Sequence, residues 1–380
     1  MHICFLTNEY PQPGYPHGGI GSFIKTLGEA LVLHGLDVSV VDIGHRDFNE
    51  HENDHGIEIY RIASAKSKRV TWYLNSRKIN KQIDCINSIR PINVIEASEM
   101  GLAFIKKRDN IKYVIRLHGG HHFFAEAENR GINWEKGLKE KRSIGKADII
   151  IGVSNYVQHQ TTKYIDLKRR IGPVIYNPVD VEKFYEADPG KIIKGRIFFA
   201  GTVCEKKGIR QLLQAMPHII QERPDAHLHI AGHDGKLYDG RSFTEYLRRS
   251  IPAEILCNIT FLGSVQNNDI PGLIEQAEVC VFPSHMETFG LAAIEAMSMG
   301  KPVVFTIKGP GPEVIKDGVT GLLCNPLDPQ DIADKTLKIL KNFEYGIILG
   351  EAARREVIER FSIKKLAEQN IEFYRILLES

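Results

Sequence analysis

Residues 279–300 read VCVFPSHMETFGLAAIEAMSMG, and this stretch decides the fold around it. A short apolar run stops at Pro283-Ser284, a polar turn follows, and Phe289-Gly290 opens a helical pattern that continues to Gly300. Short apolar runs bounded by proline are typical of buried strands. The stretch therefore predicts a strand, a loop and an amphipathic helix, the unit from which open α/β sheets are built.

The start of this predicted helix is suited to binding an anion. Gly290 allows a ligand to approach the backbone closely. The first amides of the helix, including that of Leu291, have no partners inside the helix and carry the positive end of its dipole. Such a helix start is a ready site for phosphate.

Two carboxylates, Glu287 and Glu295, flank this anion site with seven residues between them. Glu295 lies roughly 7.5 Å along the helix axis, and its side chain leans back toward the helix start. Because carboxylates repel phosphate, we expect them to accept hydrogen bonds from hydroxyls on either side of it, those of a sugar and of a ribose. An alternative remains open, in which Glu287 caps the helix and Glu295 is solvated.

The segments PSHMETFGLAAIEAMSMGKPVV and GPGPEVIKDGVTGLL resemble the Glu-x7-Glu region of glycosyltransferase family 4. This resemblance implies an α/β protein of the GT-B fold, with two Rossmann-like doubly wound domains facing a central cleft. It also implies sugar transfer from a nucleotide donor with retention at the anomeric carbon. Glu287 would then hold the donor sugar and Glu295 the ribose, with Phe289, Gly290 and Leu291 as further donor-binding positions.

The composition is consistent with a two-domain protein. A chain of 380 residues is long enough for two cores. With 25% charged residues and a net charge of +2, nothing suggests nucleic acid as a partner. A pI near 8.1 permits a weak peripheral contact with an anionic membrane surface.

The cysteines and apolar runs indicate the compartment. The six cysteines are scattered, mostly in apolar runs, and form no CxxC, so we expect reduced, buried side chains. The apolar run Ile3–Leu6 is too short for a signal peptide, and no run approaches the length of a membrane span. The sequence predicts a cytoplasmic protein whose only membrane contact would be peripheral, at the inner face.

A glycine-rich turn follows the first predicted strand. The loop from Thr7 to Gly18 leads through Gly19 and Gly21 into a helix. The third glycine of the dinucleotide fingerprint is missing, because Ile24 stands in its place. A tight turn without a ligand is one interpretation. The family resemblance implies the other, in which the amide of Gly19 lies near the donor phosphate.

The predicted strand from Tyr113 to Leu117 leads into His118-Gly119-Gly120-His121-His122. Adjacent residues of a strand point to opposite faces, and no cysteine or carboxylate completes a ligand set at normal spacing, so we expect no metal. His118 is either a structural histidine or, as the resemblance implies, a contact of the donor sugar. Residues 123–137 would form an acceptor-side contact surface or a plain surface helix.

The break at Asn177-Pro178 resembles the linker between the two domains of this family. We therefore expect an acceptor-side domain over residues 1–176 and a nucleotide-sugar donor domain over residues 177–361. The last helix, residues 362–380, would return to the first domain, as it does in GT-B enzymes. Its apolar residues fit a packed helix: Leu366, Ile371, Tyr374, Leu377 and Leu378.

Lys207 stands beside a glycine at a predicted strand-to-helix turn, where it could neutralise a diphosphate. Two solvated lysines, Lys206 and Lys207, are the alternative. The segment resembles the family pattern Gly-Arg-x4-Lys-Gly, which gives Lys207 the phosphate role but leaves Thr202 at the arginine position. Either another basic residue such as Lys206 compensates for the missing arginine, or the diphosphate is bound less strongly. The family resemblance implies that Gly232 and Val265 border the nucleobase of the donor.

The sequence contains no Asp-x-Asp, so a metal-bridged donor site has no anchor, and we expect neither metal nor cofactor. The predicted catalytic residues are His118, Lys207 and Glu287. The donor would be UDP- or GDP-linked, and the acceptor a glycan or lipid-linked molecule in cell-surface polysaccharide or glycoconjugate synthesis. Alternatives are a sugar-nucleotide epimerase or hydrolase and a non-catalytic nucleotide-sugar-binding subunit. A nicotinamide dehydrogenase is the weakest of the alternatives, since the glycine loop after the first strand lacks the third glycine of the dinucleotide fingerprint.

Overall fold

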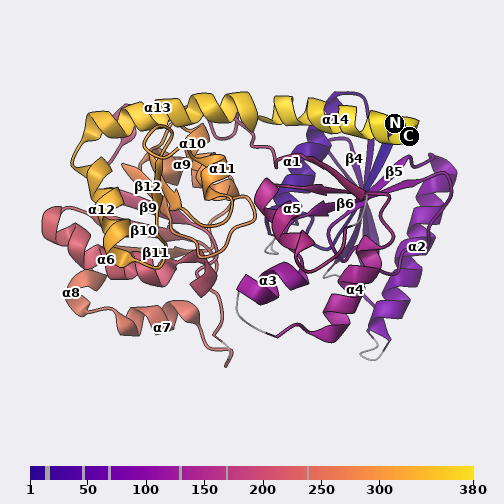
Figure 1. Ribbon diagram of the computed structural model, residues 1–380, viewed down its shortest axis with the longest axis horizontal. Coiled ribbons are helices and arrows are strands. Elements are labelled where there is room, and N and C mark those ends of the chain that lie inside the picture. Colours follow the sequence, from indigo (N-terminus) through magenta and orange to yellow (C-terminus); the bar gives the residue numbers. More distant parts are fainter. Residues whose placement is uncertain (13–17, 45–47, 67–69, 128–130, 168–169, 238) are drawn as a thin grey trace. The chain divides into compact units, whose positions relative to one another are not determined.

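A computed structural model of the chain describes residues 1–12, 18–44, 48–66, 70–127, 131–167, 170–237 and 239–380. Parts of the predicted segments 7–18 and 123–137 lie outside the described residues. The chain forms two compact units, residues 1–178 with 363–380 and residues 179–362 (Figure 1). These boundaries lie two residues and one residue beyond those that the sequence predicted. Among the described residues, no helix is long and apolar enough to cross a membrane.

Unit 1 is built on an eight-stranded sheet in the order β3-β4-β2-β1-β5-β6-β7-β8. Every neighbouring pair is parallel except β3 and β4. The sequence did not predict β3, because its residues are all polar and only the hairpin with β4 holds it at the sheet edge. The strands are β1 His2–Thr7, β2 Asp37–Gly44, β3 Glu50–Asp54, β4 Ile57–Ala63, β5 Val94–Ala97, β6 Lys112–Leu117, β7 Ile149–Gly152 and β8 Ile171–Val174.

The helices of unit 1 bury apolar stripes against this sheet. The glycine turn leads into α1, whose Phe23, Leu27 and Leu31 enter the core as their helical spacing predicts. Ser154 caps α5 by accepting a hydrogen bond from the amide of Val157, at 3.1 Å. The helices are α1 Gly19–Leu33, α2 Thr71–Ile89, α3 His121–Ala127, α4 Trp134–Ile144, α5 Asn155–Thr162 and α14 Ile363–Glu379.

The C-terminal helix α14 packs on unit 1, as predicted, and lies against α1. Four of its predicted core residues are buried and Leu378 is partly buried. A buried polar network fixes its position. Arg116 donates to Glu96 at 2.6 Å and to Asn370 at 2.5 Å, and the hydroxyl of Tyr374 donates to Glu96 at 2.7 Å. Because these buried charges need their partners, this network favours one specific docking of α14.

Unit 2 has a six-stranded parallel sheet in the order β11-β10-β9-β12-β13-β14. This is the doubly wound order, which reverses between β9 and β12. The strands are β9 Arg196–Ala200, β10 His227–Ala231, β11 Ile259–Gly263, β12 Val279–Phe282, β13 Val303–Thr306 and β14 Leu322–Cys324. The helices are α6 Ile209–Glu222, α7 Phe243–Ser250, α8 Ala253–Leu256, α9 Ile270–Glu275, α10 Leu291–Ser298, α11 Gly311–Val314, α12 Pro329–Leu340 and α13 Phe343–Arg360, with short 3-10 turns η2 Pro189–Lys191 and η3 Glu205–Lys207.

The predicted helix at Phe289–Gly300 is shorter than expected and is not amphipathic. It begins at Leu291, ends at Ser298, and is buried on most of its surface. It contacts β12, β13 and α13, so packing on several sides replaces the single apolar face. The strand-loop-helix order that the sequence predicted here is confirmed.

Candidate functional site

Open α/β sheets bind ligands beyond the carboxyl ends of their strands, where the strand order reverses. In unit 2 this point lies between the adjacent strands β9 and β12. The loop of residues 201–208 follows β9, and the loop of residues 283–290 follows β12. These two loops carry five of the predicted site residues: Thr202, Lys207, Glu287, Phe289 and Gly290.

Backbone contacts hold the two loops together. The carbonyl of Lys206 accepts hydrogen bonds from the amides of His285 and Met286, at 2.9 and 3.3 Å. Gly208 has a left-handed conformation (φ 69°), and a Cβ there would lie 1.8 Å from the carbonyl oxygen of Pro283. Only glycine meets both conditions, so Gly208 is required for this close approach.

Lys207 and Glu287, which the sequence assigned to separate roles, are direct partners. The Nζ of Lys207 donates to Oε1 of Glu287 at 2.6 Å, and the Oγ of Ser284 donates to the same oxygen at 2.9 Å. The two charged side chains are 26% and 12% exposed. Ser284 was not among the residues predicted from the sequence, although a hydroxyl three residues before Glu287 in the same loop is a usable signal.

Oε1 of Glu287 accepts from Lys207 and Ser284, and the cap position of the neighbouring helix is held by a glycine. Gly290 is the residue before α10, has φ 94°, and provides no side-chain cap. The amide of Leu291, the first helical residue, therefore belongs to the unpaired start of α10. Phe289 turns its ring into the core against Phe361, at 5.5 Å between ring centroids, so its side chain does not face a ligand.

Glu295 lies one turn into α10 and is not a solvated surface carboxylate. Burial raises the pKa of Glu295 to about 7, although Lys183 acts in the opposite direction. Near neutral pH this carboxyl is therefore close to half ionised. Strongly shifted carboxyls of this kind are frequent at functional sites.

Gly232 joins the ends of three strands. Its amide donates to the carbonyl of Gly263 at 2.8 Å, and a Cβ there would lie 1.8 Å from the carbonyl oxygen of Gly201. A pocket beside it is lined by residues that include Val203, Asp234 and Phe261. Val265, two residues beyond β11, is not among the lining residues of that pocket.

Thr202, at the position of the family arginine, lies 3.3 Å from the Nε2 of His233 through its hydroxyl. His233 was not predicted from the sequence, although its place directly after Gly232, beyond the end of β10, could have indicated it. Lys206 links its loop to the loop after β12 through its carbonyl.

In unit 1, His118 directly follows β6 and is buried beside the ring of Phe23, at 5.1 Å between centroids. Burial, assisted by the charge of Arg116, lowers the pKa of His118 to about 3, so its imidazole is neutral at physiological pH. Gly19 is the first residue of α1. The carboxylate of Glu9 lies against the preceding Gly18, since a Cβ there would lie 2.5 Å from its Oε2. Glu9 was not predicted from the sequence as a site residue.

Two buried carboxyls hold the backbone that follows His118. Oε1 of Glu99 accepts from the amide of Gly119 at 2.6 Å, and Oε2 of Glu140 accepts from the amide of His122 at 3.0 Å. Burial raises the pKa of Glu99 to about 8. The histidine loop is therefore a rigid part of the carboxyl edge of the unit 1 sheet.

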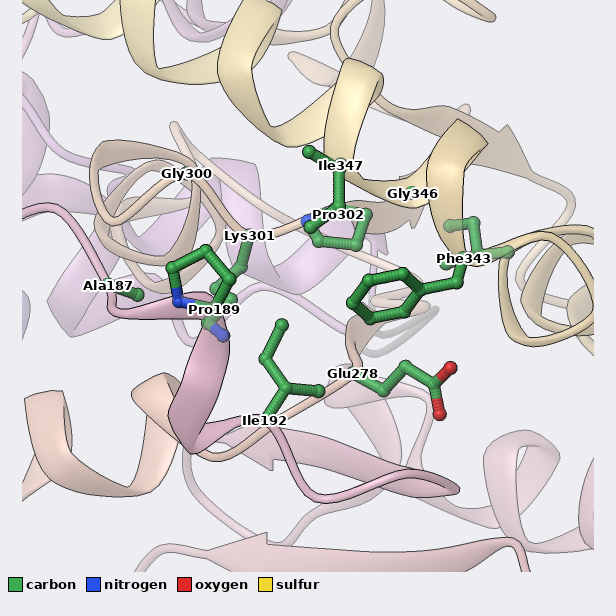
Figure 2. Close-up of a pocket in the computed structure, with 11 residues that line it drawn as sticks. Ala187, Pro189, Ile192, Glu278, Gly300, Lys301, Pro302, Phe343, Gly346 and Ile347 are labelled. Atoms are coloured by element: carbon green, nitrogen blue, oxygen red, sulfur yellow. The ribbon is translucent and has the colours of Figure 1, made fainter.

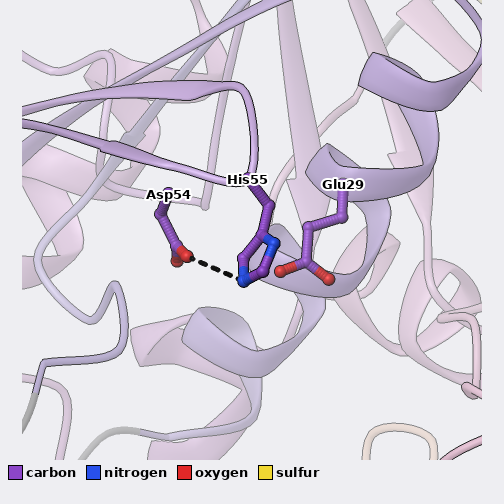
Figure 3. Close-up of side chains that lie close together, drawn as sticks. All are labelled: Glu29, Asp54 and His55. Carbon is purple, nitrogen blue, oxygen red and sulfur yellow. Dashed lines mark ion pairs between the residues drawn. The ribbon is translucent and has the colours of Figure 1, made fainter.

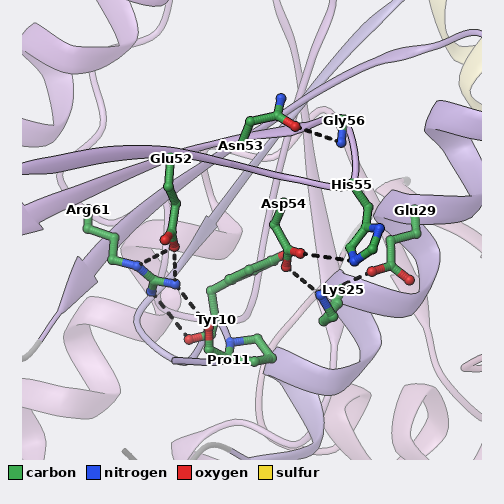
Figure 4. A network of polar contacts seen from close by, with 10 residues as sticks. All are labelled: Tyr10, Pro11, Lys25, Glu29, Glu52, Asn53, Asp54, His55, Gly56 and Arg61. Atoms are coloured by element: carbon green, nitrogen blue, oxygen red, sulfur yellow. Dashed lines mark hydrogen bonds and ion pairs between the residues drawn. The ribbon is translucent and has the colours of Figure 1, made fainter. Parts of the chain in front are cut away.

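One cluster of possible metal ligands was found in the described chain, and it combines Glu29, Asp54 and His55 (Figure 3). The ammonium of Lys25 bonds to both carboxylates (Figure 4). The wider network includes Tyr10, whose hydroxyl donates to Asp54 at 2.9 Å. A resident lysine already balances these acids, so the cluster ties the β3–β4 turn to α1 and gives no reason to place a metal there.

Figure 2 shows a small pocket in unit 2, and none of its lining residues belongs to the loops 201–208 and 283–290. Two of its lining residues, Glu278 and Pro302, directly precede β12 and β13, so it lies at the amino ends of these strands. The buried Lys301 beside it donates to the carbonyl of Glu275 at 2.6 Å. This pocket is on the edge of the sheet where α/β proteins seldom bind substrates.

Two doubly wound α/β units with paired loops at a switch point define a protein of the GT-B class. A family model described as Glycosyltransferase Family 4 matches residues 17–183, and a model described as Glycosyl transferases group 1 matches residues 194–342. The chain therefore belongs to glycosyltransferase family 4 and is a transferase enzyme.

Known proteins agree with this assignment. An uncharacterized glycosyltransferase of Methanocaldococcus jannaschii is 28% identical over 403 residues, which span 100% of this chain and 99% of the relative. Sucrose-phosphate synthase from Thermosynechococcus elongatus has a similar structure, with a TM-score of 0.83, 21% identity and 100% coverage of both chains. The Anabaena protein HepE, solved in complex with UDP and glucose, matches with a TM-score of 0.73 and 19% identity over 98% of this chain and 99% of its own. The two structures support the GT-B fold.

Proposed function

We propose that this glycosyltransferase takes a sugar from a UDP- or GDP-linked donor, with retention at the anomeric carbon, and transfers it to a glycan or lipid-linked acceptor in the synthesis of a cell-surface polysaccharide or glycoconjugate. The observation that carries the proposal is the pair of Lys207 and Glu287 beside the unpaired start of α10. A cation and free amides suit the diphosphate, while a carboxylate suits the hydroxyls of the sugar. The UDP and glucose bound to HepE support a donor of this kind.

In the proposed reaction, the bond between the anomeric carbon and the diphosphate oxygen breaks, and the acceptor oxygen bonds to the same face of that carbon. The departing phosphate takes the proton of the acceptor hydroxyl. Lys207 and the amides of Gly290 and Leu291 would stabilise the negative charge that grows on the diphosphate. Glu287 would orient the sugar and Glu295 the ribose. The roles of His118 and Gly19 stay predictions from the sequence.

The proposal is tested by thermal unfolding with UDP, GDP, ADP, NAD and their common sugar conjugates. A ligand at a hundred times its dissociation constant adds about 2.7 kcal/mol to the free energy of unfolding. We expect one nucleoside diphosphate series to raise the melting temperature, with a further rise for one sugar conjugate. The Lys207→Ala variant should show a much smaller shift with the same ligand.

A lack of any shift with the nucleoside diphosphates, or a shift with NAD alone, would contradict the proposal. Product analysis then separates it from the epimerase or hydrolase alternative. Transfer gives a glycosylated acceptor from an acceptor panel, whereas the alternative gives only an epimerised nucleotide sugar or a free sugar. Once a donor is known, incubation with that panel identifies the acceptor.

A further inference from the structure

We propose that one face of α4 in unit 1 docks on an anionic lipid surface. This α4 face consists of Trp134, Leu138, Lys141 and Arg142, together with Ile132, which lies just before the helix. The three apolar side chains are 53%, 76% and 58% exposed, in the order Ile132, Trp134 and Leu138. Trp134 and Leu138 are one helical turn apart, so they project from the same side of the helix.

The exposure of these side chains does not result from a loose helix. The opposite side of α4 is buried through Gly137, Glu140, Ser143 and Ile144. The hydroxyl of Ser143 accepts from the amide of Leu102 at 2.9 Å. The side chain of Asn133 caps the helix by accepting from the amide of Lys136 at 3.1 Å. The α4 face is therefore a fixed surface that presents apolar groups to solvent.

The charge around these apolar groups is positive. Residues 134–146 contain five cations, Lys136, Lys139, Lys141, Arg142 and Lys146, against the acids Glu135 and Glu140. Glu140 is buried, and Glu135 pairs with Lys139 at 2.6 Å. Lys141 and Arg142, whose helical positions adjoin those of Trp134 and Leu138, therefore remain as exposed positive charge beside them. This charge is complementary to anionic lipid headgroups.

The residue types favour a lipid surface over a protein partner. Tryptophan prefers the interface between water and hydrocarbon, and lysine can bury its stem there while its ammonium stays among the headgroups. Cores of protein interfaces are instead depleted of lysine. Three apolar side chains inserted among lysines give the shallow, reversible binding of a peripheral protein.

The second tryptophan of the chain lies on the same flank. Trp72, in the first turn of α2, contacts the ring of Phe104 at 4.6 Å between centroids, and the guanidinium of Arg142 lies 5.5 Å from the centre of that ring. On the buried side of α4, Glu140 bonds to the loop that follows His118. Docking would therefore hold the lipid surface beside the carboxyl edge of the unit 1 sheet. The further suggestion that the acceptor is lipid-linked rests on the proposed function, whereas docking itself does not.

Tryptophan fluorescence tests the docking directly, because the chain has only two tryptophans. In the Trp72→Phe variant, Trp134 is the only reporter. We expect its emission to shift to shorter wavelength with vesicles of equal phosphatidylglycerol and phosphatidylcholine, and to stay unchanged with pure phosphatidylcholine. Sedimentation with the mixed vesicles should decrease as salt is raised to 1 M, where the screening length is about 3 Å.

Variants of the α4 face give the decisive comparison. The double variant Trp134→Ser/Leu138→Gln should lose sedimentation with the mixed vesicles. Lys141→Gln should weaken it about fivefold, since each lysine near an anionic surface contributes about fivefold. The matched controls are Leu33→Gln, at the strongly exposed end of α1, and Lys364→Gln/Lys365→Gln on α14, and both should bind like the wild type.

Unchanged melting temperatures would show that the variants are folded. The proposal is overturned if the wild type does not sediment with the mixed vesicles, if the α4 variants bind as well as the controls do, or if only an oligonucleotide shifts the emission of Trp134. Nucleotide binding should be the same in the α4 variants and the wild type. A failure of docking is thus distinguishable from a failure of the proposed function.

Discussion

Replacing Glu287 by glutamine should have opposite effects on two measurements of the same site. In the free protein, the Nζ of Lys207 is 2.6 Å from the carboxylate of Glu287. A bound diphosphate must share this lysine and also lie near a negative charge. Glutamine removes the competing charge and keeps nearly the same shape. Bare nucleoside diphosphate should therefore bind Glu287→Gln at least as tightly as it binds the wild type.

The size of both effects can be bounded. Two unit charges about 6 Å apart repel by roughly 3 kcal/mol at an effective dielectric constant of about 20, so the gain in diphosphate affinity cannot exceed about a hundredfold. Turnover should fall by about a hundredfold or more, the usual result of removing one group that stabilises the transition state. The free energy of unfolding should change by about 1 kcal/mol or less, because the ion pair is partly exposed.

Titration calorimetry with the nucleoside diphosphate and release of nucleotide from the sugar donor supply the two measurements. Lys207→Ala is the matched comparison, since it should weaken diphosphate binding and turnover together. Bare diphosphate that binds Glu287→Gln more than tenfold more weakly than the wild type would refute the assignment of this carboxylate to the sugar. Turnover within threefold of the wild type in both variants would refute the site itself.

Three further predictions concern other parts of the chain. Because the pKa of Glu295 is about 7 and ribose hydroxyls would donate to its ionised form, nucleotide affinity measured by calorimetry should rise about tenfold from pH 6 to pH 8. The Glu295→Gln variant should show no such rise. A wild-type affinity that does not change with pH would contradict this prediction. Gly290→Ala should lower the free energy of unfolding in urea by at least about 2 kcal/mol, because the new Cβ would meet the ring of Phe305 at 2.4 Å. This loss should be larger than that caused by Gly318→Ala, where φ is 74° but the space around the Cβ is open. Tyr374→Phe should lower the free energy of unfolding by about 1–3 kcal/mol, because a buried oxygen of Glu96 loses a donor, and an unchanged value would show that the network does not fix α14.

Much of the fold could be predicted from local pattern. Short apolar runs before glycine-rich or proline-rich turns placed β1, β9 and β12, and helical spacing placed α1 and α14. These signals report how a segment alternates between buried and exposed faces, which its own residues decide. The edge strand β3 has no such signal, since all of its residues are polar. The all-round burial of α10 depends on the elements packed against it, so local spacing suggested an amphipathic helix instead.

The candidate site likewise has features that the local sequence predicts and features that only the tertiary structure shows. The sequence determined that Lys207 and Glu287 each follow a strand, and a family pattern suggested their roles. Only the tertiary structure decided that they are partners, because the parallel pairing of β9 and β12 brings together loops 80 residues apart. The same holds for the burial that sets the pKa values of Glu295 and His118. Desolvation depends on every element that covers a group, and that information is not present in the residues beside it in the chain.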